Sequence, residues 1–267
     1  MRDMLNFYTK TMKIAIMTGF QYRVSQYFYM IGMIAEPIIY LVVWSTIANA
    51  SGGTAGGLTA GQFAAYYIVW TLVRNINIVF TPYGWESRIQ HGYLSGLLLR
   101  PMHPIHYDLA YFAGAKVVDV VLWIPIATVL TLIFHPTFTA TPLAIGVFVI
   151  AIWGAYLIRS MALWLLGMIT FWTTKVSAIF ELYMAIELLL SGRLVPLSLL
   201  PGWAQQLSNF LPFQWTFSFP IEALVGNLTP LQLLGGLGFQ ALWVAIGWLL
   251  VQLVWRAGVR HFSSVGN

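Results

Sequence analysis

Very few side chains in this sequence are arranged as a reactive group would need. His103, His106 and Asp108 have a spacing loosely compatible with a metal site, but a proline interrupts them and they are more simply explained as loop residues beside an apolar segment. None of the four lysines (Lys10, Lys13, Lys116 and Lys175) lies in the Gly-rich pattern by which a P-loop holds phosphates. The motifs Gly-x-Ser-x-Gly and His-Glu-x-x-His do not occur, and there is no cysteine. We therefore expect no catalytic residue, no metal site, and no ATP or other cofactor site in this chain.

Ionisable residues inside apolar stretches are the other candidates, because a charge in such surroundings is costly and usually faces an interior or water. Lys116 and Asp119 are three residues apart on one helix face, and we expect them to pair with each other. Arg159 and Glu181 are expected to lie near enough to the cytosolic side to extend towards it. The remaining members of the set are Glu36, Arg74 and Glu187.

The composition shows what surrounds these residues. Of the 267 residues, 59% are hydrophobic and 8% are charged, whereas soluble domains carry about 25% charged residues. A soluble core of this size has no room for so much apolar surface, so the solvent must be lipid. The sequence therefore predicts a membrane protein with several spans.

The apolar stretches are continuous and do not alternate with period two, which favours helices over a barrel. We expect an all-α fold with about six spans in a single domain over residues 1–267. The predicted spans are Ser25–Ala48, Gln62–Phe80, Leu109–Phe134, Leu143–Trp172, Val176–Leu190 and Leu231–Trp255. Residues 1–23 have apolar residues at helical spacing together with lysines, which predicts an amphipathic helix lying against the lipid surface.

Basic residues are distributed unequally between the segments that connect these spans. One set of segments holds Arg2, Lys10, Lys13, Arg23, Arg88, Arg100, Lys175, Arg256 and Arg260. The opposite segments, residues 49–61, 135–142 and 191–230, hold only Arg193. The positive-inside rule then places both termini and residues 82–106 in the cytosol. The net charge of +5 comes from only 13 basic residues, and the side of the membrane that they occupy is more informative than their number, so we expect no nucleic-acid partner.

Residues 191–230 contain too many prolines for one spanning helix but are too apolar for a free loop. We expect short re-entrant helices in the outer leaflet, with Trp203 and Trp215 at the interface. Glu36, Glu187 and Arg193 are the candidate residues of a substrate path, Arg193 beside an apolar surface where an anionic or zwitterionic head group can pause. In the alternative, Glu187 neutralises Arg193 and both are structural.

The segment between the second and third spans, residues 82–106, has the features of a docking element. Leu94, Leu97 and Leu98 form an apolar surface at helical spacing, which fits the groove of a partner protein. Glu86, Arg88 and Arg100 are expected to orient that partner through charge, and Pro101 ends the element. The alternative is that the leucines are buried in the lipid interface.

Two motifs carry a resemblance to a known family. They are the run Gly-x-Leu-x-x-x-Leu-x-Arg-Pro at Gly92–Pro101 and the run Ser-Gly-Arg-x-x-Pro-Leu-x-x-x-Pro at Ser191–Pro201. With these, the chain resembles over essentially its whole length the permease subunit of type-2 ABC transporters, in a bacterial branch of that family. The resemblance implies a separate ATPase subunit, expected as a homodimer that binds Mg-ATP and contacts the segment 82–106. It also implies a second permease chain, identical or homologous, and export through the bacterial cytoplasmic (inner) membrane.

Two other functions stay open from the residues themselves. An ion-coupled secondary transporter would need a second unwound site to match Glu36-Pro37, and none is visible. A membrane-embedded transferase would need a catalytic cluster, which the sequence does not show.

Overall fold

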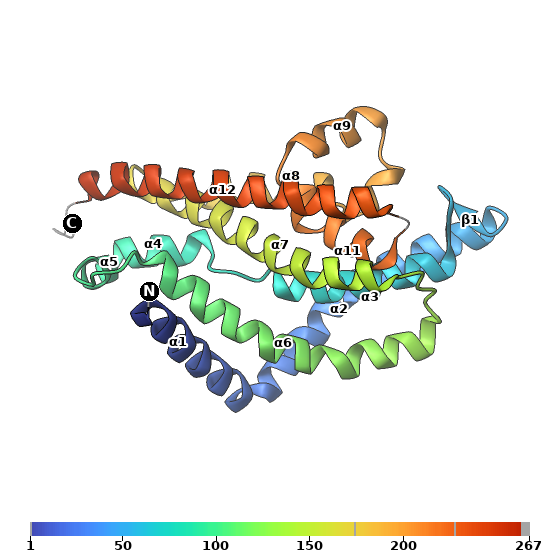
Figure 1. The fold of residues 1–267 in the computed structure, drawn as a ribbon, viewed down its shortest axis with the longest axis horizontal. Coiled ribbons are helices and arrows are strands. Elements are labelled where there is room, and N and C mark those ends of the chain that lie inside the picture. The colour runs from blue at the N-terminus through green and yellow to red at the C-terminus, as the bar shows by residue number, and fades with distance from the viewer. Residues whose placement is uncertain (1, 174, 227, 263–267) are drawn as a thin grey trace.

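The computed structural model describes residues 2–173, 175–226 and 228–262, and it is an elongated bundle of helices (Figure 1). The ends of the expected single domain, at residues 1 and 267, lie outside the described residues. The chain begins with α1 (Arg2–Gln21), which is followed directly by α2 (Arg23–Ala50). α1 packs along α6 (Ile105–Phe134). The contact is close because Gly114 of α6 lies under the backbone of α1, where an added Cβ would come within 2.5 Å of the Met12 carbonyl oxygen.

A small hairpin, which the sequence did not predict, connects α2 to α3 (Ala60–Ile76) within the all-α fold. Its strands β1 (Thr54–Ala55) and β2 (Leu58–Thr59) pair antiparallel, with Thr54 opposite Thr59. The turn residue Gly56 has a positive φ, which favours glycine, and an added Cβ would have to displace the Leu199 side chain. Thr59 then caps α3 through a reciprocal pair of hydrogen bonds with Gln62.

Two more long helices complete the length of the bundle. α7 (Pro142–Met168) continues into the 3-10 turn η1 (Ile169–Phe171), and α12 (Pro230–His261) packs against it. Both helices begin with a threonine N-cap followed by proline at the first helical position. These local signals explain why the two helices begin within a residue of the predicted spans at Leu143 and Leu231.

Each of the six predicted apolar stretches is helical, but their lengths differ. Among the described residues, four helices are long and apolar enough to cross a membrane: Arg23–Ala50, Ile105–Phe134, Pro142–Phe171 and Pro230–His261. α3 has 17 residues and α8 (Ser177–Leu190) has 14, so they measure roughly 26 and 21 Å at 1.5 Å per residue. The prediction of an α-helical protein with several membrane spans is confirmed, and the number of six spans stays a prediction.

The segment 191–230 contains short helices separated by prolines. They are η2 (Leu197–Leu199), α9 (Gly202–Phe210), α10 (Phe213–Thr216) and α11 (Ser218–Val225). Trp203 of α9 is 70% exposed, as an interfacial residue would be. Trp215 is not: it is buried, and its ring stacks on Phe239 of α12. The expectation of an interfacial position for Trp215 is therefore wrong, because α10 and α11 turn inward and pack on α7.

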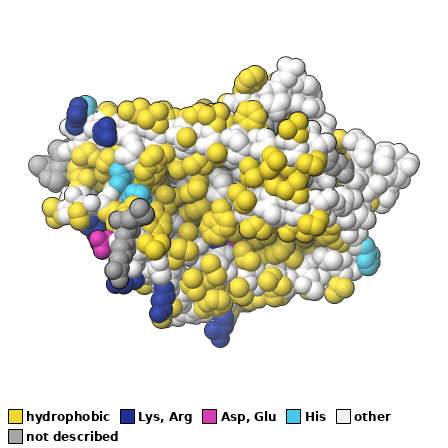
Figure 2. Space-filling model, in the orientation of Figure 1, with side chains coloured by type: hydrophobic (Ala, Val, Ile, Leu, Met, Phe, Trp, Pro, Cys, Tyr) yellow, Lys and Arg dark blue, Asp and Glu magenta, His cyan; other side chains and the backbone are white. Residues whose placement is uncertain are grey.

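One end of the molecule collects both termini together with α4 (Pro82–Gln90) and α5 (Tyr93–Leu98) (Figure 1). In the space-filling view, the visible Lys and Arg side chains lie at this end and along α1, while hydrophobic side chains cover the middle of the molecule (Figure 2). The exposed basic residues of this end include Lys10, Arg100, Arg256 and Arg260. We call it the basic end. Its surface matches the charge asymmetry on which the predicted orientation rests.

Candidate functional site

The first candidate comprises the short helices α4 and α5 with the three residues that follow them, which we call the arm (residues 82–101). Gly92, with φ 70°, allows the turn between the two helices. Trp85 anchors the arm: its indole is fully buried and meets the rings of Trp164 and Trp255 edge to face, at centroid distances of 4.6 and 6.1 Å. The arm is therefore packed firmly on α7 and α12.

Charged residues of the arm bind inward. Arg88 makes a two-pronged ion pair with Asp108 at the start of α6, at 2.6 and 2.8 Å, and Trp164 Nε1 donates to the same carboxylate at 2.9 Å. Glu86 accepts a hydrogen bond from the backbone N–H of Val176, just before α8. Both side chains were expected to orient a partner protein. Their geometry instead ties the arm to α6 and α8.

The leucines of the arm divide into buried and exposed positions. Leu94 is 0% exposed, so it is part of the core and its side chain does not present a docking surface, contrary to expectation. Leu97 and Leu98 are half-buried against the same core. Leu99, which the spacing argument passed over, is 87% exposed. The reason is that α5 has only six residues, so the sequence spacing does not fix which of its faces turns inward.

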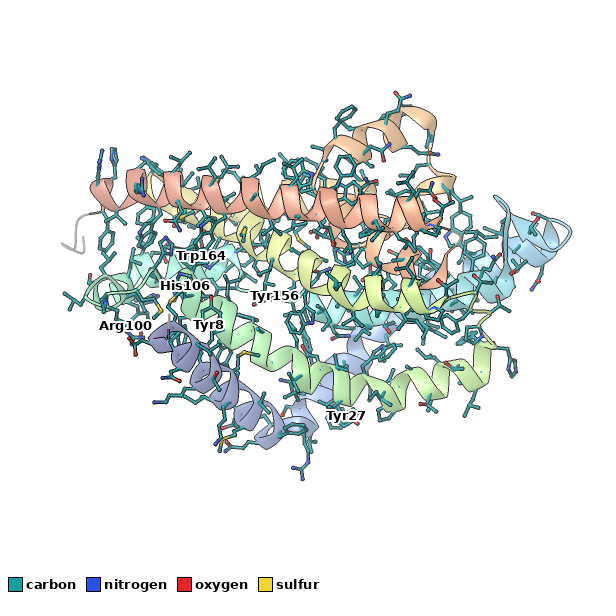
Figure 3. All side chains as sticks on the ribbon, viewed as in Figure 1. Tyr8, Tyr27, Arg100, His106, Tyr156 and Trp164 are labelled. Atoms are coloured by element: carbon teal, nitrogen blue, oxygen red, sulfur yellow. The ribbon has the colours of Figure 1, made fainter. Side chains whose placement is uncertain are left out.

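Exposed side chains gather at the tip of the arm. Tyr93, Leu99, Arg100 and Pro101 are all exposed there, and Figure 3 shows Arg100 at the basic end of the molecule. Nearby, the Tyr8 hydroxyl of α1 and Nδ1 of His106 are 2.8 Å apart, and this contact joins α1 to the start of α6 (Figure 3). The tip is an apolar and basic surface on a firmly anchored support.

The second candidate is a set of five charged side chains that meet between the helices, which we call the central charge network. It consists of Glu36 on α2, Arg74 on α3, Arg159 on α7, Glu187 on α8 and Arg193. Glu36 is 13 residues from the start of α2 and 14 from its end, roughly 20 Å from each at 1.5 Å per residue. Charges at such a depth persist where they are paired or line an internal path.

Each carboxylate of the network has its own arginine. Arg74 Nη1 lies 2.5 Å from Glu36, and Arg159 binds Glu187 through two bonds of 2.8 Å. The prediction that Arg159 extends to the cytosolic side is wrong, because Arg159 is buried and its remaining nitrogen donates to the Asn77 carbonyl. Each carboxylate also accepts from a tyrosine hydroxyl, Tyr40 at 3.3 Å and Tyr183 at 3.2 Å.

Arg193 is bound less completely than the other two arginines. It lies 3.4 Å from Glu187 and 3.8 Å from Glu36, both longer than the bonds those carboxylates make to Arg74 and Arg159. Its Nε is buried and has no hydrogen-bond partner among the described residues. Stacking of its guanidinium near Phe217, 5.3 Å from the ring centroid, compensates part of this loss.

A cavity of about 200 Å³ adjoins the network. All three arginines line it and neither glutamate does. Its other walls come from α2, from the linker between α3 and α4, and from α7 and α8, with Met33, Ile78, Leu163 and Met184 among them. The substrate-path residues Glu36, Glu187 and Arg193 are thus brought together, and the structure adds Arg74 and Arg159 to them.

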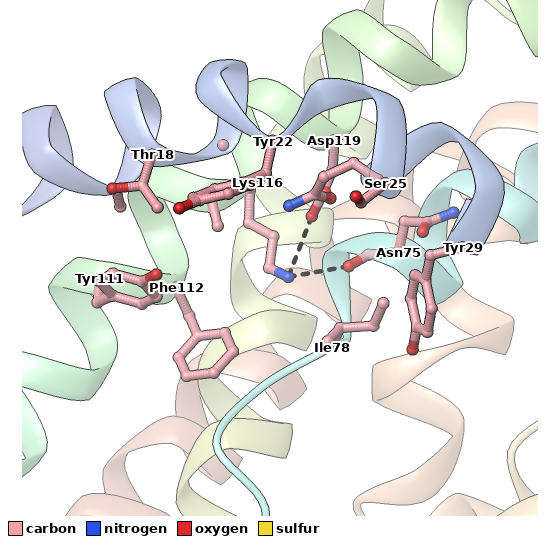
Figure 4. A pocket seen from close by; sticks show the side chains of 14 residues that line it. Thr18, Tyr22, Ser25, Tyr29, Asn75, Ile78, Tyr111, Phe112, Lys116 and Asp119 are labelled. Carbon is pink, nitrogen blue, oxygen red and sulfur yellow. Dashed lines mark hydrogen bonds and ion pairs between the residues drawn. The ribbon is translucent and has the colours of Figure 1, made fainter.

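A third polar group lies under α1 (Figure 4). Lys116 Nζ donates to the Asn75 carbonyl at 2.9 Å and pairs with Asp119 at 3.3 Å, as the sequence predicts. The adjoining cavity of about 470 Å³ is lined by tyrosines and by small polar residues of α1 and α2, including Tyr22, Ser25 and Tyr29. Lys116 and Asp119 neutralise each other, so this cavity carries no surplus charge from the pair. The described residues contain no cluster of His, Cys, Asp or Glu that could hold a metal ion.

Sequence reasoning missed the pairing of the network rather than its members. Arg74 and Arg159 stand out in the sequence as charges in apolar stretches. Their partners are 38 and 28 residues away, on other helices, so no spacing rule connects them. Asp108 was considered only beside His103 and His106, where a metal site was rejected.

Comparison with known protein families identifies a match. A family model described as ABC-2 family transporter protein matches residues 34–266. No curated protein matches the chain. The matched range contains the whole arm and all five residues of the central charge network.

Proposed function

The chain belongs to the ABC-2 transporter family, and on that premise we propose that it is the membrane-spanning permease subunit of an ATP-driven exporter. Membership makes it a multi-pass permease that works with an ABC ATPase. The finer statements are our proposal. The ATPase is a separate homodimer that binds Mg-ATP, this chain hydrolyses no ATP itself, and a second permease chain, identical or homologous, completes the path in the bacterial inner membrane.

The observation that carries the proposal is the construction of the arm. The α4 part of the arm is held in place by Trp85, by the Arg88–Asp108 ion pair and by the hydrogen bond of Glu86 to the backbone just before α8. Its tip exposes Tyr93, Leu99 and Arg100 at the basic end. Tyr93 and Leu99 together expose apolar surface on a rigid support, and such a surface suits the groove of a cytosolic ATPase.

The basic end supports a cytosolic position for the tip. This end carries the exposed Lys10, Arg100, Arg256 and Arg260, whereas the opposite connections 51–59 and 135–141 contain no Lys or Arg. The positive-inside rule then puts both termini and the arm in the cytosol. An ion-coupled transporter or a transferase would have no need of such an element, so we prefer the ATPase-driven permease over both.

The test is copurification of the ATPase with arm variants. Leu99→Asp should leave the permease inserted and reduce the amount of ATPase recovered with it about tenfold or more, the effect of losing about 1.4 kcal/mol or more of binding. Leu231→Asp is the matched control, because Leu231 is 82% exposed at the start of α12, away from the basic end. Full recovery of an active ATPase with Leu99→Asp would disprove the docking role of the tip.

A further inference from the structure

The central charge network has one more positive charge than it needs. Three arginines face two glutamates, and each glutamate is already matched by one arginine at 2.8 Å or less. The tyrosine hydroxyls of Tyr40 and Tyr183 supply further donors to the same carboxylates. Arg193 is therefore the surplus cation of the network.

The surplus charge of Arg193 is unusual because this side chain is buried. Arg193 is only 7% exposed, yet it has a single hydrogen bond of 3.4 Å among the described residues and an unpartnered Nε. A buried guanidinium presents five N–H donors, and leaving them unmet is costly. Among the described residues, Arg193 therefore has donors that are free to bind a further acceptor.

The cavity shows where that acceptor would lie. Arg74, Arg159 and Arg193 all line it, while Glu36 and Glu187 lie outside its walls. An anion placed there contacts the three guanidinium groups, whose charge exceeds that of the two glutamates by one. Its volume of about 200 Å³ equals the share of about six or seven water molecules in the liquid, at roughly 30 Å³ each, enough for a phosphate or carboxylate group but not for a whole lipid.

We infer that this cavity binds one anionic group, a phosphate or a carboxylate, through Arg193 with Arg74 and Arg159 beside it. The inference rests on the proposed function and deepens it by naming the chemical class of the transported molecule. Most of the cavity's other walls, including Met33, Leu163 and Phe217, are apolar. The bearer of the group is therefore an amphiphile whose apolar part remains outside the cavity, along the helices.

The Lys116 cavity serves as an internal comparison. It is larger, at about 470 Å³, and it also contains a buried cation, but Lys116 is bound both to Asp119 and to the Asn75 carbonyl. A cation whose partners are already in the protein has no need of an external anion. The buried cations of the two cavities therefore differ in that Arg193 has an unpartnered buried Nε among the described residues.

The test measures binding to the purified full-length permease in neutral detergent, from the shift of its melting temperature. Two probes are titrated separately: dioleoyl phosphatidate in mixed micelles, against the same amount of dioleoyl phosphatidylcholine, and sodium phosphate, against sodium chloride of equal ionic strength. Stabilisation by phosphatidate alone assigns the anionic group to an amphiphile. Stabilisation by free phosphate as well supports the anion site and overturns the restriction to amphiphiles.

Variants locate the binding. Arg193→Gln should raise the apparent Kd of the stabilising probe about 10- to 100-fold, the effect of one lost charge-assisted hydrogen bond, and Arg193→Lys should recover part of the affinity. Met33→Trp should weaken binding by filling the cavity while keeping all three arginines, which protects the test if Arg193→Gln folds poorly. Arg256→Gln removes an equal charge at the exposed basic end and should bind as the unaltered chain does.

Two results would overturn the inference: no stabilisation of the unaltered chain by either probe, or equal binding by Arg193→Gln and Arg256→Gln. Neither result bears on ATPase copurification, which is measured separately with Leu99→Asp. Failure of the anion site and failure of the proposed permease function are therefore distinguishable.

Discussion

The ion pair between Arg88 of the arm and Asp108 of α6 makes a contribution to the free energy of unfolding that can be worked out directly from the structure. Asp108 is buried at 4% exposure and accepts bonds of 2.6 and 2.8 Å from Arg88 and one of 2.9 Å from Trp164. Replacing Arg88 with Met keeps most of the side-chain volume and removes the first two bonds. Two charge-assisted hydrogen bonds at about 1.5–3 kcal/mol each give about 3–6 kcal/mol. Removal of one partner from a buried ion pair independently costs about 3–5 kcal/mol.

We therefore expect Arg88→Met to destabilise the folded chain by about 3–5 kcal/mol. Asp108→Asn is the reciprocal change, since an amide still offers an acceptor to Trp164 but no charge to Arg88. In the double variant neither charge is left unpaired, so it should be more stable than Arg88→Met alone. The measurement is the free energy of unfolding of the purified permease in mixed micelles, made for both single variants and the double variant.

The same variants decide whether Arg88 acts inside the chain or on the ATPase. If Arg88 serves as a clamp on Asp108, both single variants should loosen the arm and reduce ATPase recovery together. The reasoning is refuted if Arg88→Met loses the ATPase while Asp108→Asn retains it fully and both variants are as stable as the unaltered chain. That pattern would return Arg88 to the partner-contacting role that its sequence position suggests.

Three further outcomes are expected. Because the chain has no cysteine, single cysteines at Thr54 and at Tyr93 can be labelled without background; an impermeant thiol reagent should reach only the first in intact cells, and the reverse pattern would invalidate the orientation. Burial, together with the neighbouring His106, lowers the pKa of His103 from 6.5 to about 4. The stability that neutral His103 contributes is therefore complete above about pH 6.5 and is lost as the pH falls towards 4. The melting temperature of His103→Phe should depend less on pH between these values than that of the unaltered chain. Gly114→Ala places a Cβ against the α1 backbone and should cost about 1–3 kcal/mol of stability, whereas the open position Gly146→Ala should cost nothing measurable.

The membrane helices were predictable because lipid imposes a simple rule on the sequence. An apolar run long enough to span a bilayer satisfies its backbone only as a helix, and all six predicted runs are helical for that reason. Their ends were less predictable where no strong signal exists. α3 ends at Ile76 rather than at Phe80, because residues 77–81 lead into the proline that begins α4. The hairpin at 54–59 was missed because two-residue strands leave no periodic pattern.

The candidate site was predictable in its members and not in its geometry. Glu36, Glu187 and Arg193 were identified because charges in apolar surroundings demand an explanation, and they do lie together. The pairing of each arginine with its glutamate depends on how α2, α3, α7 and α8 pack against one another. The spacing of residues along the sequence does not predict that packing. The orientation of α5 fails for the same reason, so Leu94 was expected outside and Leu99 was overlooked.

The arm and the cavity are joined by the linker 77–81, and this connection gives the two candidate sites a common mechanical basis. Ile78, Val79 and Thr81 form part of the cavity wall, and Pro82 begins the arm immediately after them. Arg88 of the arm lies over the ring of Phe80 in the linker, 3.8 Å from its centroid, while Arg159 of the network binds the Asn77 carbonyl. Because contacts hold both ends of this short linker, the linker cannot stretch or bend enough to absorb a displacement of the arm. Under the function proposed above, movement of the tip by the ATPase would change the wall beside the three arginines, where we infer that the anionic group binds.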